Sequence, residues 1–221
     1  MEAITAFSFD DMTLPDQGGE FDLALQNYFS FIRRFGLRDG CVARQVHGAS
    51  IIEAAGLPRT RPIFPVVYGE ADAIWTAEPD VWVGVYTADC LPLLLDAGER
   101  VMAVHAGWRG LAAGIISNAI EAAGGASRVK SVTLGPAAAG CCYEVGGEVL
   151  DAIDKAGIEP VSSGRNLDLP LTAERHLRAL GVGTILRSDP FGCTICDRRF
   201  RSYRRDGDCS GRNLSVIALK N

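Results

Sequence analysis

A cysteine and a histidine lie on either side of a short loop, in a segment whose pattern predicts a β-hairpin. Two apolar runs, Leu91 to Leu95 and Val101 to Val104, flank an Asp-Ala-Gly-Glu stretch. A short turn containing Gly between two such runs is typical of a hairpin. If Ala97-Gly98 is the two-residue loop, Cys90 lies directly opposite His105. Facing residues have Cβ atoms about 4.5 to 5.5 Å apart, so this thiolate and this imidazole could share one zinc ion.

A second histidine supplies a third candidate ligand. His47 lies in a strand-like run that a glycine interrupts directly after it, so we expect it near a strand end or bend. Two imidazoles and one thiolate are the ligand set of a catalytic zinc site that keeps its fourth position open. Taken singly, a histidine is more often a satisfied polar residue and a cysteine a small core residue. The predicted hairpin therefore favours a metal for Cys90 and His105, and only the strand-end position associates His47 with them.

The same side chains allow a different chemistry. A Cys-His pair can act as a nucleophile and its base, with Asp89 or Gln45 orienting the imidazole. Spacing in the sequence does not separate a metal ligand from a nucleophile.

A second group of cysteines is a weaker candidate for a metal site. Cys193-x-x-Cys196 together with Cys141-Cys142 could form a structural zinc site. CxxC alone is a loose pattern, and two adjacent cysteines lack the usual ligand spacing, so the sequence does not favour this site.

Two arginine-containing segments indicate where an anion could bind. A helix-like run from Leu111 to Ala123 follows the hairpin and places Arg109 beside a helix N-terminus, where anions bind readily. Residues 198–212 interleave Phe200 and Tyr203 with arginines. A run of charge is usually solvated, but aromatic interleaving in an acidic chain predicts a pocket wall that stacks a flat ring and holds an oxyanion.

Composition limits the class of protein. A chain of 221 residues with 48% hydrophobic content predicts one domain, residues 1–221, with a sizeable core. Its net charge of -5 excludes a general footprint for nucleic acid, so an anion site must be local. Because the sequence has no signal-like start and no run of about eighteen apolar residues, we expect a cytoplasmic protein that does not enter membranes. Seven cysteines without a dense small-domain framework favour reduced thiols or metal ligands.

The elements that must position these residues are mixed in kind. Apolar spacing predicts a packing helix over 21–35 that Gly36 ends, and a Pro- and Gly-rich loop is expected over 57–70. Further strands are expected at 71–76, 81–87, 129–134, 184–186 and 214–219, and helices around 145–153 and 171–180. Without a regular βαβ repeat, this order predicts an α/β (mixed α+β) fold of layered mixed β-sheets flanked by helices.

A series of short motifs runs from about residue 40 to the C-terminus. They are Gln45-Val46-His47-Gly48, Ala71-Asp72-Ala73, Thr87-Ala88-Asp89-Cys90, His105-Ala106-Gly107-Trp108-Arg109-Gly110, Gly135-Pro136, Cys142-Tyr143-Glu144-Val145, Asp168-Leu169, Cys193-Thr194, Ser202-Tyr203-Arg204-Arg205-Asp206 and Gly211-Arg212. Together they resemble the family historically named laccase-domain or multi-copper polyphenol oxidase proteins. Members of that family are described as zinc-containing purine nucleoside phosphorylases with adenosine deaminase activity. By this resemblance His47, Cys90 and His105 correspond to the metal ligands.

The resemblance implies phosphorolysis of purine nucleosides. Phosphate would attack C1′ of adenosine or inosine, and of methylthioadenosine, to release the base and ribose 1-phosphate or, from methylthioadenosine, its 5-methylthio derivative. Arg109, helped by Arg44 or Arg204, would hold the phosphate, while Tyr203 or Phe200 would stack on the purine. Gln45 is a further expected substrate contact.

The same resemblance implies deamination of adenosine. Zinc would activate the water that attacks C6 of adenine. Asp89 and Glu144 are the candidate catalytic carboxylates that carry the proton.

Two rival functions follow from other features. A copper-dependent polyphenol oxidase would need many imidazoles, and the three histidines cannot supply them, although copper is an alternative occupant of the same site. A non-catalytic, zinc-stabilised binding protein would need a closed four-ligand site in place of an open one. The sequence does not predict the oligomeric state.

Overall fold

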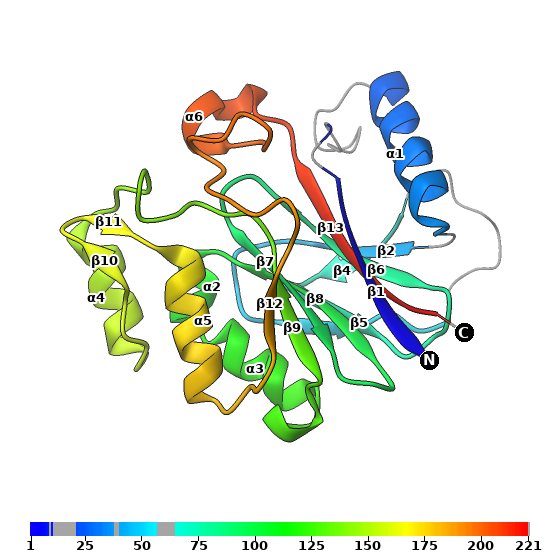
Figure 1. Cartoon of the computed structure of the whole chain (residues 1–221), viewed down its shortest axis with the longest axis horizontal. Helices are drawn as coiled ribbons and strands as arrows, with labels where there is room; N and C mark the ends of the chain where they lie inside the picture. Colours follow the sequence, from blue (N-terminus) through cyan, green and yellow to red (C-terminus); the bar gives the residue numbers. More distant parts are fainter. Residues whose placement is uncertain (9, 11–20, 38–39, 57–64, 221) are drawn as a thin grey trace.

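Two mixed β-sheets form the body of the protein (Figure 1). The computed structural model describes residues 1–8, 10, 21–37, 40–56 and 65–220. The first sheet has the order β1-β13-β6-β2-β4, and the second has the order β12-β9-β7-β8-β5-β3. Both sheets combine parallel and antiparallel neighbours.

The strands are short, and those at the sheet centres are the most buried. The first sheet consists of β1 (Glu2–Ser8), β2 (Gly40–Arg44), β4 (Val66–Glu70), β6 (Trp82–Thr87) and β13 (Asn213–Lys220). The second consists of β3 (Ile51–Glu53), β5 (Ala73–Thr76), β7 (Leu91–Asp96), β8 (Val101–Ala106), β9 (Ser131–Leu134) and β12 (Ile185–Arg187). A separate small hairpin pairs β10 (Ser162–Ser163) with β11 (Asn166–Leu167).

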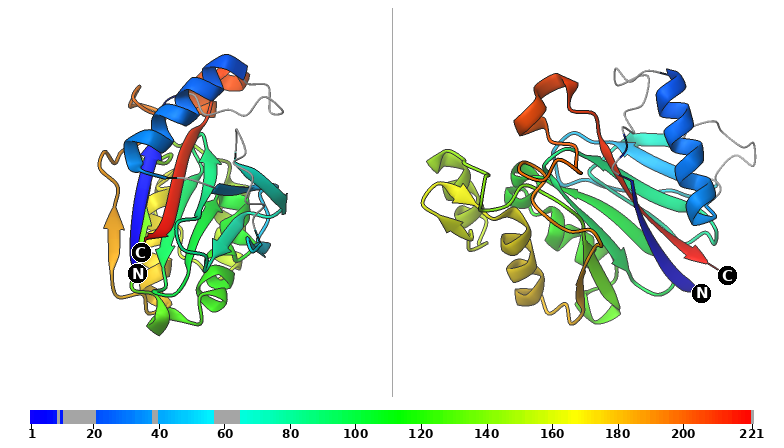
Figure 2. Two further views of the ribbon diagram at one scale, coloured as in Figure 1. Left: turned by 90° about the vertical axis from the view of Figure 1, so that its right-hand side faces the viewer. Right: turned by 45° about the horizontal axis from the view of Figure 1, so that its top comes forward.

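Helices cover the outer faces of both sheets (Figure 2). Helix α1 (Phe21–Phe35) packs Tyr28 and Phe31 against Trp82 of the first sheet. The second sheet is covered by α2 (Trp108–Ala112), α3 (Ile115–Ala122), α4 (Gly147–Lys155) and α5 (Leu169–Ala179). A last short helix, α6 (Tyr203–Asp206), precedes β13. None of the helices formed by the described residues has the length and apolarity that a membrane span needs.

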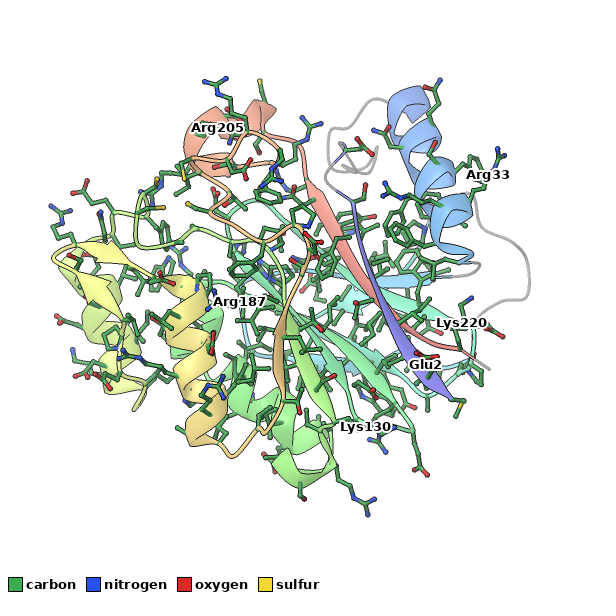
Figure 3. All side chains as sticks on the ribbon, viewed as in Figure 1. Glu2, Arg33, Lys130, Arg187, Arg205 and Lys220 are labelled. Atoms are coloured by element: carbon green, nitrogen blue, oxygen red, sulfur yellow. The ribbon has the colours of Figure 1, made fainter. Side chains whose placement is uncertain are left out.

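Apolar side chains from both sheets form the core between them. Val83 and Ile217 of the first sheet pack in one cluster with Leu94 and Ala103 of the second. Charged side chains such as those of Arg33 and Lys130 project from the surface instead (Figure 3). This arrangement confirms the expected mixed α+β fold of layered sheets flanked by helices.

Among the described strands, the chain passes from the first sheet to the second at three places. One crossing runs from β2 to β3 through the loop that contains His47. The second runs from β4 to β5 through Ala71-Asp72, and the third runs from β6 directly into β7 through Ala88-Asp89-Cys90. Strand β8 pairs with both β5 and β7 and carries His105 next to its end. The crossings and this strand end therefore determine where the three candidate ligands lie.

The hairpin exists, but its predicted register is wrong by two residues. Pro92 pairs with His105, and the N–H of Ala97 donates to the carbonyl of Arg100 at 3.0 Å, so Gly98-Glu99 is the loop. Gly98 adopts a φ of 81°, which favours glycine, and its N–H is bonded to the Asp96 carboxylate at 2.7 Å. A shift of two residues keeps every side chain on its predicted face.

Most of the other predicted helices and strands are present, but several begin or end at different residues than predicted. The helix over 21–35 is confirmed, and His47 does lie at a bend after a strand. Residues 66–70 form β4 and not a loop, because they pair in parallel with β2, while 57–64 lie outside the described residues. The helix expected over 111–123 begins at Trp108 and is divided, since Gly114 adopts a φ of 87° between α2 and α3.

Gly40 in β2 provides a test of the packing between β2 and β6. A Cβ atom at position 40 would overlap the indole ring of Trp82, which is fully buried. We expect Gly40→Ala to lower the free energy of unfolding by about 1–3 kcal/mol through overpacking. Gly183→Ala is the control, because its Cβ would have no heavy atom within 4 Å. Equal denaturant midpoints for the two variants would contradict this packing.

Candidate metal centre and adjoining cavity

The three predicted ligands come together in the structure. The ligand atoms of His47, Cys90 and His105 all lie within 4.8 Å of one another. The two imidazole rings meet edge to face, with centroids 4.9 Å apart. His105 is buried and Cys90 half-buried, whereas His47 is exposed, so the group faces solvent on one side. Two nitrogens and a thiolate at this separation fit a tetrahedral zinc ion with one open position.

One buried carboxylate holds two of the ligands in place. Asp72 Oδ1 accepts hydrogen bonds from His105 Nδ1 at 2.8 Å and from the His47 N–H at 2.9 Å. Asp72 Oδ2 accepts from the backbone N–H groups of Gly48 at 2.6 Å and Val46 at 3.3 Å. Because Nδ1 of His105 is used in this way, Nε2 is the nitrogen left for a metal. The same bonds support His47 in a backbone conformation with a φ of 60°.

Hydrogen bonding keeps Asp72 ionised. Burial raises the pKa of Asp72, but the bond from His105 and the backbone N–H groups lower it by more. The net pKa lies below the usual range, so the carboxylate is charged and can fix the tautomer of His105.

Cys90 fits beside His105 because a glycine faces it. A Cβ atom at Gly107 would lie 2.8 Å from Cys90 Sγ. Burial raises the pKa of Cys90, but His105 and His47 lower it to about 6. Burial lowers the pKa of His105, but Cys90 and Asp72 raise it to about 9. A thiolate and an imidazolium therefore face each other, and a divalent cation can take the place of the imidazolium proton.

A cavity of about 480 Å³ adjoins the three ligands. Its wall includes nearly all of the predicted site residues, namely Arg44, Gln45, His47, Asp89, Cys90, His105, Arg109, Tyr203 and Arg204. It also includes Tyr86, Trp108, Tyr143 and Arg212, to which the sequence analysis gave no role. Trp108, Tyr143 and Arg212 lie inside the motifs on which the family resemblance rests. Their place in those motifs is the sequence feature that could have indicated a role at the site.

Two of the predicted site residues have structural partners at the cavity wall. The Asp89 carboxylate accepts from the Thr194 hydroxyl and from the Arg204 N–H, both at 2.7 Å. The Gln45 side chain forms two bonds with the backbone of Tyr86, at 2.7 and 2.8 Å. Asp89 thus joins the β6–β7 crossing to the segments that carry Thr194 and Arg204.

Two other side chains lie outside this cavity. The Glu144 carboxylate lines a neighbouring cavity, where it lies 3.5 Å from Arg165, and only its carbonyl contacts Arg204. Phe200 is 1% exposed and belongs to the interior, so the hypothesis that it stacks on a ligand is wrong. The arginine-rich sequence around Phe200 is compatible with a ring that faces a ligand and with a ring that packs in the interior. The structure shows the second arrangement. His176, the third histidine of the chain, does not border the cavity and lies 3.1 Å from the Ser117 hydroxyl.

The cavity wall concentrates positive charge and aromatic surface. Arg109 lies over the Trp108 ring at 4.4 Å, and Arg204 lies over the Tyr143 ring at 5.2 Å. Arg44 and Arg212 complete a set of guanidinium groups at the same cavity. In a chain with a net charge of -5, this cavity is a local concentration of positive charge.

Comparisons with known proteins agree on one family. Residues 15–220 match the family model described as "Multi-copper polyphenol oxidoreductase laccase". Purine nucleoside phosphorylase PA4543 of Pseudomonas aeruginosa is 40% identical over 187 residues, 80% of this chain and 72% of that protein. Purine nucleoside phosphorylase YfiH of Escherichia coli is 36% identical over 184 residues, 79% of this chain and 72% of that protein. YlmD from Geobacillus stearothermophilus has a crystal structure similar to this fold, with a TM-score of 0.86 at 26% identity, covering 99% and 92% of the two chains.

Asp72 can be tested apart from the ligands it supports. We expect Asp72→Asn to weaken zinc binding about 10- to 100-fold, because a neutral amide supports His105 and the His47 loop less well. Competition with a chromophoric chelator measures this affinity. Asp96→Asn is the control, since the Asp96 carboxylate accepts from the Gly98 N–H in the hairpin loop and does not border the cavity. An unchanged zinc affinity in Asp72→Asn would contradict the role of this carboxylate.

Proposed function

The chain belongs to the multi-copper polyphenol oxidoreductase laccase family, and from that membership and the site we propose that it is a zinc-dependent purine nucleoside phosphorylase with adenosine deaminase activity. One observation carries the proposal. Metal ligands, guanidinium groups and aromatic rings share a single cavity of about 480 Å³. This volume lies within the usual range for small-molecule sites, about 300–1,000 Å³.

Phosphate binding is assigned to the arginines of the cavity. Arg44, Arg109 and Arg204 can each donate charge-assisted hydrogen bonds to phosphate oxygens. Contacts with aromatic rings already restrict Arg109 and Arg204, so less side-chain freedom is lost when the anion binds. Arginine fits this task better than lysine, because its planar fork can grip two oxygens.

Binding of the purine is assigned to the aromatic side chains. Tyr203 is 53% exposed and lies at the cavity wall, where it can cover a flat base. Tyr143 and Trp108 offer further ring surface on the same cavity. With phosphate held by the arginines, the ribose would lie between the two, so that C1′ faces the attacking oxygen.

His47, Cys90 and His105 would hold the zinc ion. Two nitrogens and one thiolate suit zinc, and the exposed side of His47 provides the open position of a catalytic site. When bound, zinc supplies Lewis acidity that polarises a substrate oxygen or lowers the pKa of water. Asp89 is the carboxylate of the cavity wall and is assigned proton transfer, since each of its oxygens keeps a second acceptor position.

A copper oxidase is the second candidate, because the family description names copper. The sequence holds three histidines, and His176 contacts Ser117 away from the cavity, so two imidazoles serve the centre. Multinuclear oxidase sites need more nitrogen ligands than this. Copper at the centre would be an alternative single occupant. A purely structural zinc role is disfavoured, because the ligand group is not closed on the His47 side.

A product assay tests the proposed reaction. We expect adenosine and inosine to release free base and ribose 1-phosphate, and methylthioadenosine to release adenine and 5-methylthioribose 1-phosphate, only when phosphate is present. Adenosine without phosphate should still yield inosine, because deamination needs water alone. Chromatography of each reaction separates the products. Base release that is indifferent to phosphate, or oxidation of a phenol in place of these products, would refute the proposal.

Arg109→Ala is expected to raise the KM for phosphate roughly 10- to 150-fold, because it removes a charge-assisted contact worth roughly 1.5–3 kcal/mol. Activity should recover partly at high phosphate. Arg100→Ala is the matched control: Arg100 also covers a tryptophan ring, that of Trp75, at 4.6 Å, but does not border the cavity. An equal phosphate KM in both variants would argue against the assigned role of Arg109.

Substitution of Cys90 separates a metal ligand from a nucleophile. As a ligand, Cys90→Asp should retain measurable zinc and some activity at elevated zinc, because carboxylate also binds zinc. Cys90→Ala should retain less, since it offers no ligand atom. Metal analysis and activity at a series of zinc concentrations measure the difference. A substrate-derived adduct on Cys90, detected by mass spectrometry in active metal-free protein, would establish a nucleophile instead.

A further inference from the structure

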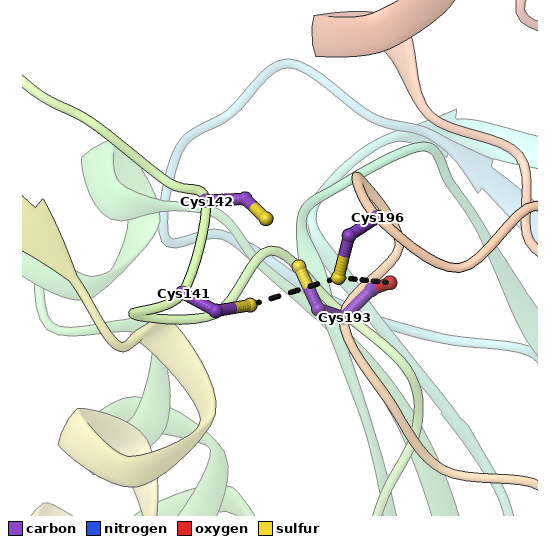
Figure 4. Close-up of side chains that lie close together, drawn as sticks. All are labelled: Cys141, Cys142, Cys193 and Cys196. Carbon is purple, nitrogen blue, oxygen red and sulfur yellow. Dashed lines mark hydrogen bonds between the residues drawn. The ribbon is translucent and has the colours of Figure 1, made fainter.

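Four cysteines outside the proposed catalytic centre form a second cluster (Figure 4). Cys141 and Cys142 lie in the loop between β9 and α4, and Cys193 and Cys196 lie in the segment after β12. All four sulfur atoms lie within 4.8 Å of one another. The structure contains them as free thiols.

We propose that Cys141, Cys142, Cys193 and Cys196 bind a second, structural zinc ion. Zinc holds thiolate sulfurs at about 2.3 Å, so the sulfurs of a tetrahedral site are about 3.8 Å apart. The Cys141 and Cys196 sulfurs are 3.7 Å apart. Four thiolates complete the tetrahedron and leave no open position, which is the property of a structural and not a catalytic site.

Backbone hydrogen bonds hold the two cysteine pairs next to each other. Ala137 and Cys193 form a parallel β-bridge, and the Thr194 N–H donates to the Ala137 carbonyl at 3.1 Å. Each pair also lies on a tight turn. The Asp197 N–H donates to the Cys193 carbonyl, and the Cys142 N–H donates to the Ala139 carbonyl, both at 3.0 Å. The protein backbone therefore fixes the ligand positions independently of the sulfur atoms.

An arginine side chain holds the segment that carries Cys193 and Cys196. Arg205, labelled in Figure 3, donates from Nη1 to the carbonyls of Thr194 and Ile195, at 2.9 and 3.3 Å. The same guanidinium is paired with the Asp206 carboxylate at 2.7 Å, so Arg205 helps to fix the backbone of this segment.

The second zinc ion would join two parts of the catalytic cavity wall. Tyr143 follows Cys142 directly, and Thr194 follows Cys193 and bonds to Asp89. A metal between the cysteine pairs fixes these two segments relative to each other. This role is separate from the proposed nucleoside chemistry and does not depend on it.

Metal analysis of the full-length protein, purified under nitrogen, tests the site. We expect about two zinc ions per wild-type chain, one for each cluster. Cys196→Ser and Cys141→Ser should lose about one, whereas Cys209→Ser should lose none, because Cys209 is exposed and belongs to neither cluster. His47→Ala should also lose about one ion, but from the other centre. One zinc ion in the wild type, or full retention in Cys196→Ser, would overturn the proposal.

Cobalt substitution identifies which centre is affected. Cobalt bound by four thiolates should give intense sulfur-to-metal charge-transfer absorption that His47→Ala retains and Cys141→Ser loses. Amide hydrogen exchange of residues 137–146 and 193–205 should become faster in Cys196→Ser but not in Cys209→Ser. This readout does not depend on catalysis and shows whether the remaining fold is intact. A Cys141–Cys196 disulfide in the wild type, or iron with inorganic sulfide in place of zinc, would overturn the assignment.

Discussion

The site depends on the ionised carboxylate of Asp72, which is fully buried at the crossing from β4 to β5. A buried charge is costly unless hydrogen bonds satisfy it. Here one imidazole and three backbone N–H groups do so. Because these donors belong to His105 and to the loop of His47, satisfying the charge also places both ligands. The energetic requirement of a single acid thus determines the geometry of the metal centre.

The sheets determine the rest of that geometry. Strand β6 of the first sheet leads within three residues into β7 of the second, so Cys90 lies at the junction of the two layers. Cys90 is diagonal to His105 across the hairpin, and Gly107 leaves space for its sulfur. Asp89, with a φ of 93°, turns the chain at this junction, and its bonds to Thr194 and Arg204 connect the crossing to the C-terminal segment.

Local patterns in the sequence predicted the hairpin, the helix over 21–35 and the proximity of Cys90 to His105. The predicted register of the hairpin was wrong because the sequence allows the two-residue loop to begin at either Ala97 or Gly98. The backbone hydrogen bond between Ala97 and Arg100 shows that it begins at Gly98. Asp72 received no role because its partners are more than twenty residues away in the chain. Glu144 was grouped with the site by its motif, yet its carboxylate faces Arg165, since neighbours in sequence need not share a cavity. Long-range contacts of this kind leave no local pattern.

The centre of His47, Cys90 and His105 and the four-cysteine cluster would differ in net charge once each holds zinc. This difference in charge fits a catalytic role for the first and a structural role for the second. A zinc ion with one thiolate and two neutral imidazoles carries a net positive charge, which adds to that of the arginines around the cavity. A zinc ion with four thiolates carries a net negative charge and would repel phosphate. In an acidic chain, the proposed anionic substrate would therefore be drawn to the centre of His47, Cys90 and His105. The four-cysteine cluster is suited to joining two segments of chain, because its ligands already complete the coordination of the metal.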